Sequence, residues 1–207
     1  MPKSSSDNLK ARAGLRFGAE IEAGLAESIQ TKQQVLKKLV PVIDRVAKLL
    51  IDSLSAGHKL LLFGNGGSAA DSQHIAAELI GKLKTKRRAL PAIALTTDTS
   101  NLTALANDFG YDTIFERQIE ALGQEGDVAI GISTSGHSPN VLAAVRAARE
   151  KEMKTVALTG RDGGPLAKLV DVSITIPSDS TQRIQESHIT IAHILCELVE
   201  AHFAAKG

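Results

Sequence analysis

The segment over residues 58–78 constrains this chain more than any other. It begins with an apolar run at 60–63, continues through a glycine-rich turn at 64–67, and then has the pattern of a helix opened by Ser68. Glycines let the backbone turn sharply and approach a ligand closely. The first turn of a helix presents free N–H groups and the positive end of the helix dipole. The segment predicts a buried strand, a turn that can hold polar oxygens, and a helix behind it.

Two side chains that can carry chemistry follow on the predicted helix. His74 and Glu78 are four residues apart, so they share one helix face. An imidazole and a carboxylate can act as acid–base groups or as metal ligands. Such pairs are also common on solvated faces, and the turn has neither the dinucleotide-binding spacing nor the lysine of a P-loop. This segment alone therefore leaves both a ligand site and a structural turn open.

Composition excludes several classes of protein. The chain has 207 residues, a net charge of +1 and a single cysteine, Cys196, which fits one domain in a reducing compartment. No apolar run reaches transmembrane length, and the polar N-terminus lacks a signal core. The basic run at 82–88 is expected to be a solvated helix end, with an anion site as the alternative. We expect a cytoplasmic protein that binds neither nucleic acid nor membrane.

Short apolar runs alternate with helical patterns from His58 onward. The predicted strands are 59–63, 91–95, 127–132, 154–158 and 172–176. The predicted helices are 68–82, 99–107, 113–122, 138–151, 165–169 and 181–204. This alternation predicts an α/β fold in which a five-stranded parallel sheet is flanked by helices on both faces, as a three-layer sandwich.

The N-terminal region differs from this pattern. Residues 1–13 are expected to be a disordered tail, and residues 14–207 a single domain that includes two N-terminal helices. Apolar residues recur at helical spacing over 17–29 and again over 35–54, with a break expected at Pro41. This helical arm has more apolar surface than one side of a small sheet needs, which favours a subunit interface.

The loop at 133–140 is expected to bind an anion. It follows the third predicted strand, and ligands bind at the carboxyl ends of strands in such sheets. Its sequence, STSGHSPN, places four hydroxyls and a glycine before a helix. We expect one hydroxyl to cap that helix and the loop as a whole to bind phosphate.

The last predicted helix carries further candidates. Gln185 and His193 are eight residues apart, so both can face one site two turns apart. By itself His193, among apolar neighbours, is more typical of a hydrogen-bonded core histidine than of a catalytic residue. His188 and His202 are expected to have structural or surface roles.

Four segments in this order resemble those of the phosphoheptose isomerases, also called sedoheptulose 7-phosphate isomerases, of the sugar-isomerase (SIS) domain superfamily. They are GNGGSAADSQHIAAE, LTTDTSNLTALANDFGY, GDVAIGISTSGHSPN and RIQESHITIAHIL. The resemblance implies a SIS-type, Rossmann-like fold. It also implies conversion of sedoheptulose 7-phosphate to D-glycero-D-manno-heptose 7-phosphate through an enediol, the first step of ADP-heptose precursor synthesis for the lipopolysaccharide core.

The resemblance also implies roles for individual residues. Those expected to bind the substrate's sugar chain are Asn65, Gly66, Gly67, Glu78, Asn107, Asp108 and Gln185. Those expected to hold its phosphate are Ser133, Thr134, Ser135 and Ser138. The positions that match ligands of one zinc per subunit are His74, Glu78, Gln185 and His193. Glu78 and His193 also match the proton-transfer residues, and family members form homotetramers with active sites at subunit interfaces.

Three alternatives remain open at this point. The first is a non-catalytic tetrameric SIS protein that regulates a replication initiator, and the second is a SIS sensor domain that binds a sugar phosphate. The third is an isomerase for a different phosphorylated sugar. Retention of Glu78, Gln185 and His193 favours an enzyme. Whether Glu78 is a metal ligand, a base or both is not decided by the sequence.

Overall fold

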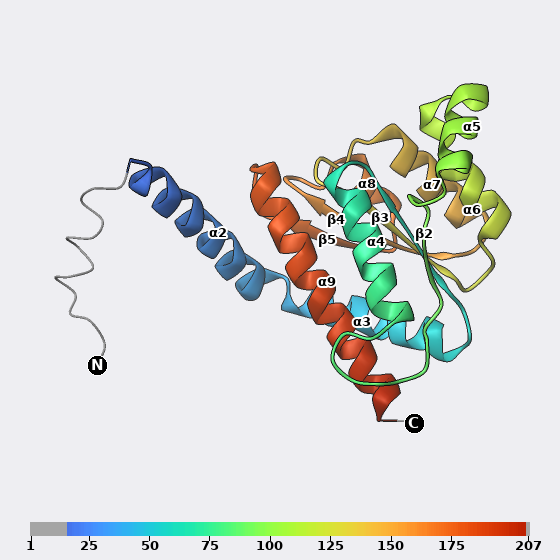
Figure 1. Ribbon diagram of the computed structural model, residues 1–207, viewed down its shortest axis with the longest axis horizontal. Helices are drawn as coiled ribbons and strands as arrows, with labels where there is room; N and C mark the ends of the chain where they lie inside the picture. Colours follow the sequence, from blue (N-terminus) through green and yellow to red (C-terminus); the bar gives the residue numbers. More distant parts are fainter. Residues whose placement is uncertain (1–15, 206–207) are drawn as a thin grey trace.

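The computed structural model describes residues 16–205, so the tail expected at 1–13 lies outside the described residues. Figure 1 shows a central sheet with helices on both faces. The strands are β1 (Leu60–Gly64), β2 (Ala92–Ala94), β3 (Val128–Ser133), β4 (Lys154–Gly160) and β5 (Val172–Ile176). The helices are α2 (Gly18–Lys38), α3 (Val40–Ser55), α4 (Gly67–Ile80), α5 (Thr99–Phe109), α6 (Glu116–Leu122), α7 (Pro139–Glu150), α8 (Gly164–Leu169) and α9 (Thr181–Ala204), with one 3-10 turn, η1 (Tyr111–Thr113).

The predicted five-stranded parallel sheet is confirmed. Its strand order is β2-β1-β3-β4-β5, and every neighbouring pair is parallel. The chain passes from β1 to β2 on one side and then crosses to β3 on the other side. The loops after β1 and β3 therefore diverge at a point where the strand order reverses, with Gly64 beside Ile132. Ligand sites in parallel sheets form at such a point.

Alternating side chains of β1 divide the core into two layers. Leu60 and Leu62 pack in the layer that contains α3, α4 and α9. Leu61 and Phe63 pack in the layer that contains α6, α7 and α8. Successive side chains of a strand point to opposite faces, and a strand covered on both faces is apolar throughout. Helices α4 and α9 lie side by side on the same face of the sheet (Figure 1).

The break expected at Pro41 is confirmed. Helix α2 ends at Lys38 and α3 begins at Val40, which places Pro41 in the first turn of α3. Proline is tolerated there because the N–H it lacks would have no partner within the helix. Helix α3 packs against the sheet, whereas α2 projects from the body of the molecule (Figure 1). No helix among residues 16–205 is long and apolar enough to cross a membrane.

The basic run at 82–88 is not a helix end, contrary to expectation. Helix α4 stops at Ile80, and Gly81 takes a conformation that the helix cannot continue. The run lies in the loop between α4 and β2. The run is also only partly solvated, because the side chain of Arg87 is 1% exposed.

His188 has the structural role expected of it. It lies on α9 and is fully buried, and its Nε2 is 3.0 Å from the carbonyl oxygen of Thr159 on β4. Burial disfavours the charged imidazolium and lowers the pKa of His188 to about 4, although the bond to Thr159 opposes this shift. His188 is therefore a neutral core residue that joins α9 to the sheet.

We predict that His188 makes the fold less stable in mild acid. In the folded protein the pKa of His188 is about 4, below the ordinary value of 6.5. Its contribution to the free energy of unfolding is therefore complete above pH 6.5 and is lost as the pH falls toward 4. Between pH 7 and pH 5 this group alone should cost on the order of 2 kcal/mol of unfolding free energy. His188→Gln removes the titration and should flatten that loss. Urea unfolding of both proteins at pH 7 and pH 5, at one protein concentration, measures the loss of unfolding free energy. An equal loss in wild type and His188→Gln would contradict this role of His188.

Candidate functional site

The turn after β1 has a backbone that only glycine accommodates well. Gly66 has φ 57° and ψ −122°, a combination that strains any residue with a Cβ. Gly64 lies so close to β3 that an added Cβ would be 2.7 Å from the carbonyl oxygen of Ile132. Gly66 and Gly67 are both exposed at the start of α4. The predicted strand, turn and helix are therefore present, with the turn open to a ligand.

Asn65 joins this turn to two other elements. It exchanges two amide hydrogen bonds with Asn140 of α7, each 2.9 Å long. The Tyr111 hydroxyl of η1 donates to the same Asn65 oxygen at 3.1 Å. Sequence reasoning missed Asn140 and Tyr111. The signal for Asn140 was an amide at the end of the 133–140 loop, and the structure buries that side chain.

The hydroxyls of the 133–138 loop bond mainly within the loop. Ser133 Oγ lies 3.0 Å from Ser138 Oγ and accepts the Gly136 N–H at 3.2 Å, while Ser135 Oγ accepts the His137 N–H at 3.2 Å. Ser138 occupies the N-cap position of α7 but makes no side-chain cap bond. The expectation that one hydroxyl caps this helix is wrong, because the Ser138 hydroxyl turns toward Ser133 instead.

This loop retains the features of an anion site. Ser133 is the last residue of β3, Thr134 and Ser135 follow it, and Ser138 is the N-cap residue of α7. The positive end of the α7 dipole has no side-chain cap, and helix N-termini of this kind attract phosphate. The Asn65–Asn140 pair fixes this loop beside the turn after β1.

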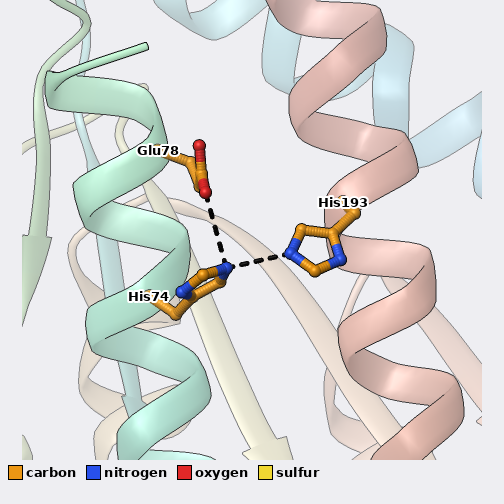
Figure 2. A group of neighbouring side chains, drawn as sticks. All are labelled: His74, Glu78 and His193. Carbon is orange, nitrogen blue, oxygen red and sulfur yellow. Dashed lines mark hydrogen bonds and ion pairs between the residues drawn. The ribbon is translucent and has the colours of Figure 1, made fainter. Parts of the chain in front are cut away.

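His74, Glu78 and His193 converge between α4 and α9, as Figure 2 shows. His74 Nε2 is 2.9 Å from His193 Nε2 and 3.5 Å from Glu78 Oε1. The ligand atoms of all three residues lie within 4.8 Å of one another. Glu78 is the more sheltered member of its pair, with a side chain 17% exposed against 47% for His74.

This group can do two kinds of chemistry. A bond between the two imidazole nitrogens requires a hydrogen on one of them, so one ring donates and the other accepts. The group can therefore pass a proton from one ring to the other. Two imidazole nitrogens and one carboxylate oxygen are also the three-ligand set typical of catalytic zinc, which keeps a fourth position open.

Gln185 contacts the start of α4. Its side-chain amide packs on Gly67, where an added Cβ would be 1.7 Å from Gln185 Nε2. Gly67 and His74 are seven residues apart on α4, which is about 10 Å along the helix axis. The structure thus places Gln185 beside the glycine turn and the two histidines further along the helices.

Asn107 and Asp108 are exposed at the end of α5. The Asn107 amide donates to the Asp108 carboxylate at 2.7 Å, and within residues 16–205 neither side chain bonds to the turn after β1. Tyr111, which follows them, makes that connection. Asn107 and Asp108 are therefore connected to the turn after β1 indirectly, through Tyr111, which follows them in the chain.

Asp71 is a further polar group near the site. It lies on α4 one turn before His74, and its Oδ2 is buried with no hydrogen-bond partner among the described residues. Burial raises the pKa of the Asp71 carboxyl, and the charge of His74 partly opposes that shift. Nothing in the spacing of the sequence had pointed to it.

Comparisons with known proteins identify the family of this chain. Residues 25–160 match the SIS domain family. The chain is 56% identical over 181 residues to the phosphoheptose isomerase of Geobacter sulfurreducens, covering 87% of this chain and 96% of the relative. It is also 56% identical over 174 residues to that of Aquifex aeolicus, covering 84% and 91%.

Solved structures give the same result. The phosphoheptose isomerase of Neisseria gonorrhoeae superimposes with a TM-score of 0.84 at 48% identity, covering 88% of this chain and 97% of that chain. The enzyme of Francisella tularensis superimposes with a TM-score of 0.86 at 40% identity, with the same coverage. By family match, identity and structure, this chain belongs to the phosphoheptose isomerases of the SIS domain family.

Proposed function

We propose that the protein isomerises sedoheptulose 7-phosphate to D-glycero-D-manno-heptose 7-phosphate. One observation carries the proposal: α4 begins beside the glycine turn and the serine loop and carries an acid–base group two turns later. A long sugar with its phosphate and its reacting carbons at opposite ends suits that spacing. The relatives named phosphoheptose isomerase support the same reaction, and none of the observations favours a non-catalytic regulator of replication.

The phosphate would bind in the serine loop. Hydroxyls and backbone N–H groups at the N-terminus of α7 suit a dianion, because charge-assisted hydrogen bonds are the strong ones. The groups proposed to hold it are those of Ser133, Thr134, Ser135 and Ser138. The sugar chain would extend from there along Asn65, Gly66 and Gly67 toward Gln185, with Asn107 and Asp108 as further contacts from α5.

Glu78 and His193 would move the protons. Glu78 takes a proton from C1 of the ketose while His193 donates one to the carbonyl oxygen at C2, which gives the enediol. Glu78 then returns a proton to C2 while His193 removes the hydroxyl proton from the oxygen on C1, which gives the aldose. Each positioned group typically contributes about 10²–10⁴-fold to the rate. The shelter of Glu78 and its contact with His74 support its assignment as the base.

We also propose one zinc per subunit. His74, Glu78 and His193 fit the donor set of catalytic zinc, with all three ligand atoms close enough to share one ion. The resemblance adds Gln185 as a ligand, whereas its position against Gly67 supports a contact with the sugar. A bound zinc ion would act as a Lewis acid toward the oxygens on C1 and C2. From the family resemblance we also propose that the reaction takes place in the cytoplasm. It would supply the heptose precursor of the lipopolysaccharide core.

Turnover of a series of ketose phosphates tests the proposed function. The purified protein should convert sedoheptulose 7-phosphate to the aldose, and should act poorly on five- and six-carbon ketose phosphates and on unphosphorylated sedoheptulose. NMR or coupled detection of the aldose product measures this. A preference for a shorter sugar phosphate would mean that this sugar, and not sedoheptulose 7-phosphate, is the substrate. Absence of an aldose product with every sugar tested would overturn the proposal.

A double serine variant tests the proposed phosphate site. Ser133→Ala with Ser135→Ala removes two hydroxyls from the loop and should raise KM for the phosphorylated sugar at least about tenfold, the scale of one or two hydrogen bonds. The same variant should leave the poor activity on unphosphorylated sedoheptulose as it was. An unchanged KM would place the phosphate elsewhere.

Removal of metal tests the zinc proposal. Dialysis against a strong chelator should lower turnover at least about tenfold, and zinc should restore it, because the ion would stabilise charge on the substrate oxygens. Metal analysis of the untreated protein should give about one zinc per subunit, falling sharply in His74→Gln. Full turnover of metal-free protein would mean that the three residues act only as hydrogen-bonding and acid–base groups.

A homotetramer is the proposed assembly. An apolar stripe runs along α2 from its N-cap residue. It consists of Phe17, Ile21, Leu25 and Ile29, and each is between 58% and 61% exposed. Ile194, next to His193, is also 42% exposed. A hollow of about 150 Å³ lies between α2, α3 and α9 and is lined largely by apolar side chains. Apolar surface of this extent favours helices of further copies as its cover.

Light scattering measures the assembly. The wild-type protein should have the mass of four subunits at micromolar concentration, because the α2 stripe would be buried between copies. Ile21→Glu should dissociate it by placing a charge in that interface. Gln30→Glu, which adds a charge to an exposed position beside the stripe, serves as the control and should stay tetrameric. A stable wild-type monomer would defeat this proposal.

A further inference from the structure

We propose that Arg87 and Glu200 form a buried clamp that positions Glu78 and His193 for proton transfer. Arg87 lies in the loop between α4 and β2, and Glu200 lies on α9. Neither residue belongs to the acid–base group itself. The proposal deepens the proposed function and rests on it, since it assigns two positioning residues to the same reaction.

Arg87 closes the end of α4. Its Nη2 donates to the carbonyl oxygen of Glu78 at 2.7 Å, and its Nη1 donates to the carbonyl oxygens of Gly81 at 3.1 Å and Arg88 at 2.9 Å. The last carbonyls of a helix have no partner within it, and a cation there also suits the helix dipole. The guanidinium therefore holds the backbone of the residue whose side chain is the proposed base.

Glu200 holds the loop that carries Arg87. Its carboxylate accepts the N–H groups of Leu83 at 2.8 Å and of Lys84 and Thr85 at 2.7 Å each. Glu200 Oε2 is also 3.8 Å from Arg87 Nε, and both side chains are almost fully buried. Burial alone would raise the pKa of the Glu200 carboxyl, but the three N–H donors and the charge of Arg87 hold that pKa below its ordinary value.

The clamp joins the two helices of the proposed site. Glu200 lies seven residues after His193 on α9, which is two turns along the same helix. Arg87 bonds directly to Glu78 on α4. The contact of 2.9 Å between His74 and His193 depends on how α4 and α9 sit against each other. A misplacement of about 1 Å in a catalytic group can cost 10²-fold in rate, so a fixed connection two turns away bears on turnover.

The chain supplies a matched control. Lys84 and Glu197 form an ion pair of 2.7 Å between the same loop and the same helix. Both side chains are exposed, at 67% and 44%, and exposed pairs of this kind contribute little. A change in this pair alters the same two elements and leaves the buried connection to Glu78 intact.

Five variants of the full chain test the clamp: Arg87→Gln, Arg87→Lys, Glu200→Gln, and the controls Lys84→Gln and Glu197→Gln. With sedoheptulose 7-phosphate, Arg87→Gln and Glu200→Gln should lower kcat at least about tenfold and change KM less than threefold, since the phosphate loop is untouched. Arg87→Lys keeps the charge without the fork of donors and should recover little of the loss. Both controls should stay within twofold of wild type.

Amide hydrogen exchange gives a readout that needs no substrate. The N–H groups of residues 83–85 should be protected in wild type and should exchange at least tenfold faster in Glu200→Gln. Residues 74–82 should exchange faster in Arg87→Gln, while the strands keep their protection. The controls should match wild type in both segments.

The proposal is overturned if folded Arg87→Gln or Glu200→Gln keeps kcat within twofold, if only KM changes, or if Glu197→Gln loses as much kcat. Failure of all three clamp variants to fold would make the pair purely structural and would also overturn it. A wild-type protein without turnover would defeat the proposed function instead. In that case amide hydrogen exchange tests the clamp by itself, and unchanged protection of residues 74–82 in Arg87→Gln would refute it.

Discussion

The side-by-side contact of α4 and α9 on one face of the sheet is the constraint on which the rest of the site depends. His74 and Glu78 come from one helix and His193 from the other, so a short contact between imidazoles exists only if both helices are held in place. The sheet fixes α4 through the turn after β1, and α9 through buried contacts such as His188 with Thr159. The loop from α4 to β2 then returns to α9 through Glu200.

The order of the strands sets the other end of the site. Because β1 lies next to β3, the glycine turn and the serine loop leave the sheet side by side. The reciprocal amide pair of Asn65 and Asn140 then fixes one loop against the other. A phosphate held by the uncapped N-terminus of α7 would lie beside the start of α4. One helix thus leads from the proposed phosphate site to the proposed acid–base group.

Local patterns in the sequence predicted the elements well. Strands buried on both faces are apolar runs, and a proline inside a helical pattern predicts a break, which the structure has at Pro41. The convergence of His74 with Glu78 also follows from helical spacing. Pairings across long stretches of chain were not predictable: Asn65 meets a partner 75 residues away, and Glu200 binds N–H groups more than 110 residues earlier. The missing side-chain cap on α7 was likewise not predictable. It depends on the rotamer of Ser138, whose hydroxyl bonds to Ser133, and residue spacing does not determine that rotamer.

Exchange of the substrate's C1 hydrogen with solvent deuterium tests the central claim, that Glu78 is the base of an enediol mechanism, most directly. In deuterium oxide the wild-type protein should wash deuterium into C1 of sedoheptulose 7-phosphate or C2 of the aldose. Glu78→Gln keeps the shape of the side chain and removes the base, so exchange and kcat should both fall at least about 10²-fold in variant protein that carries as much zinc as wild type and still binds the sugar phosphate. Exchange by Glu78→Gln at the wild-type rate would contradict the mechanism.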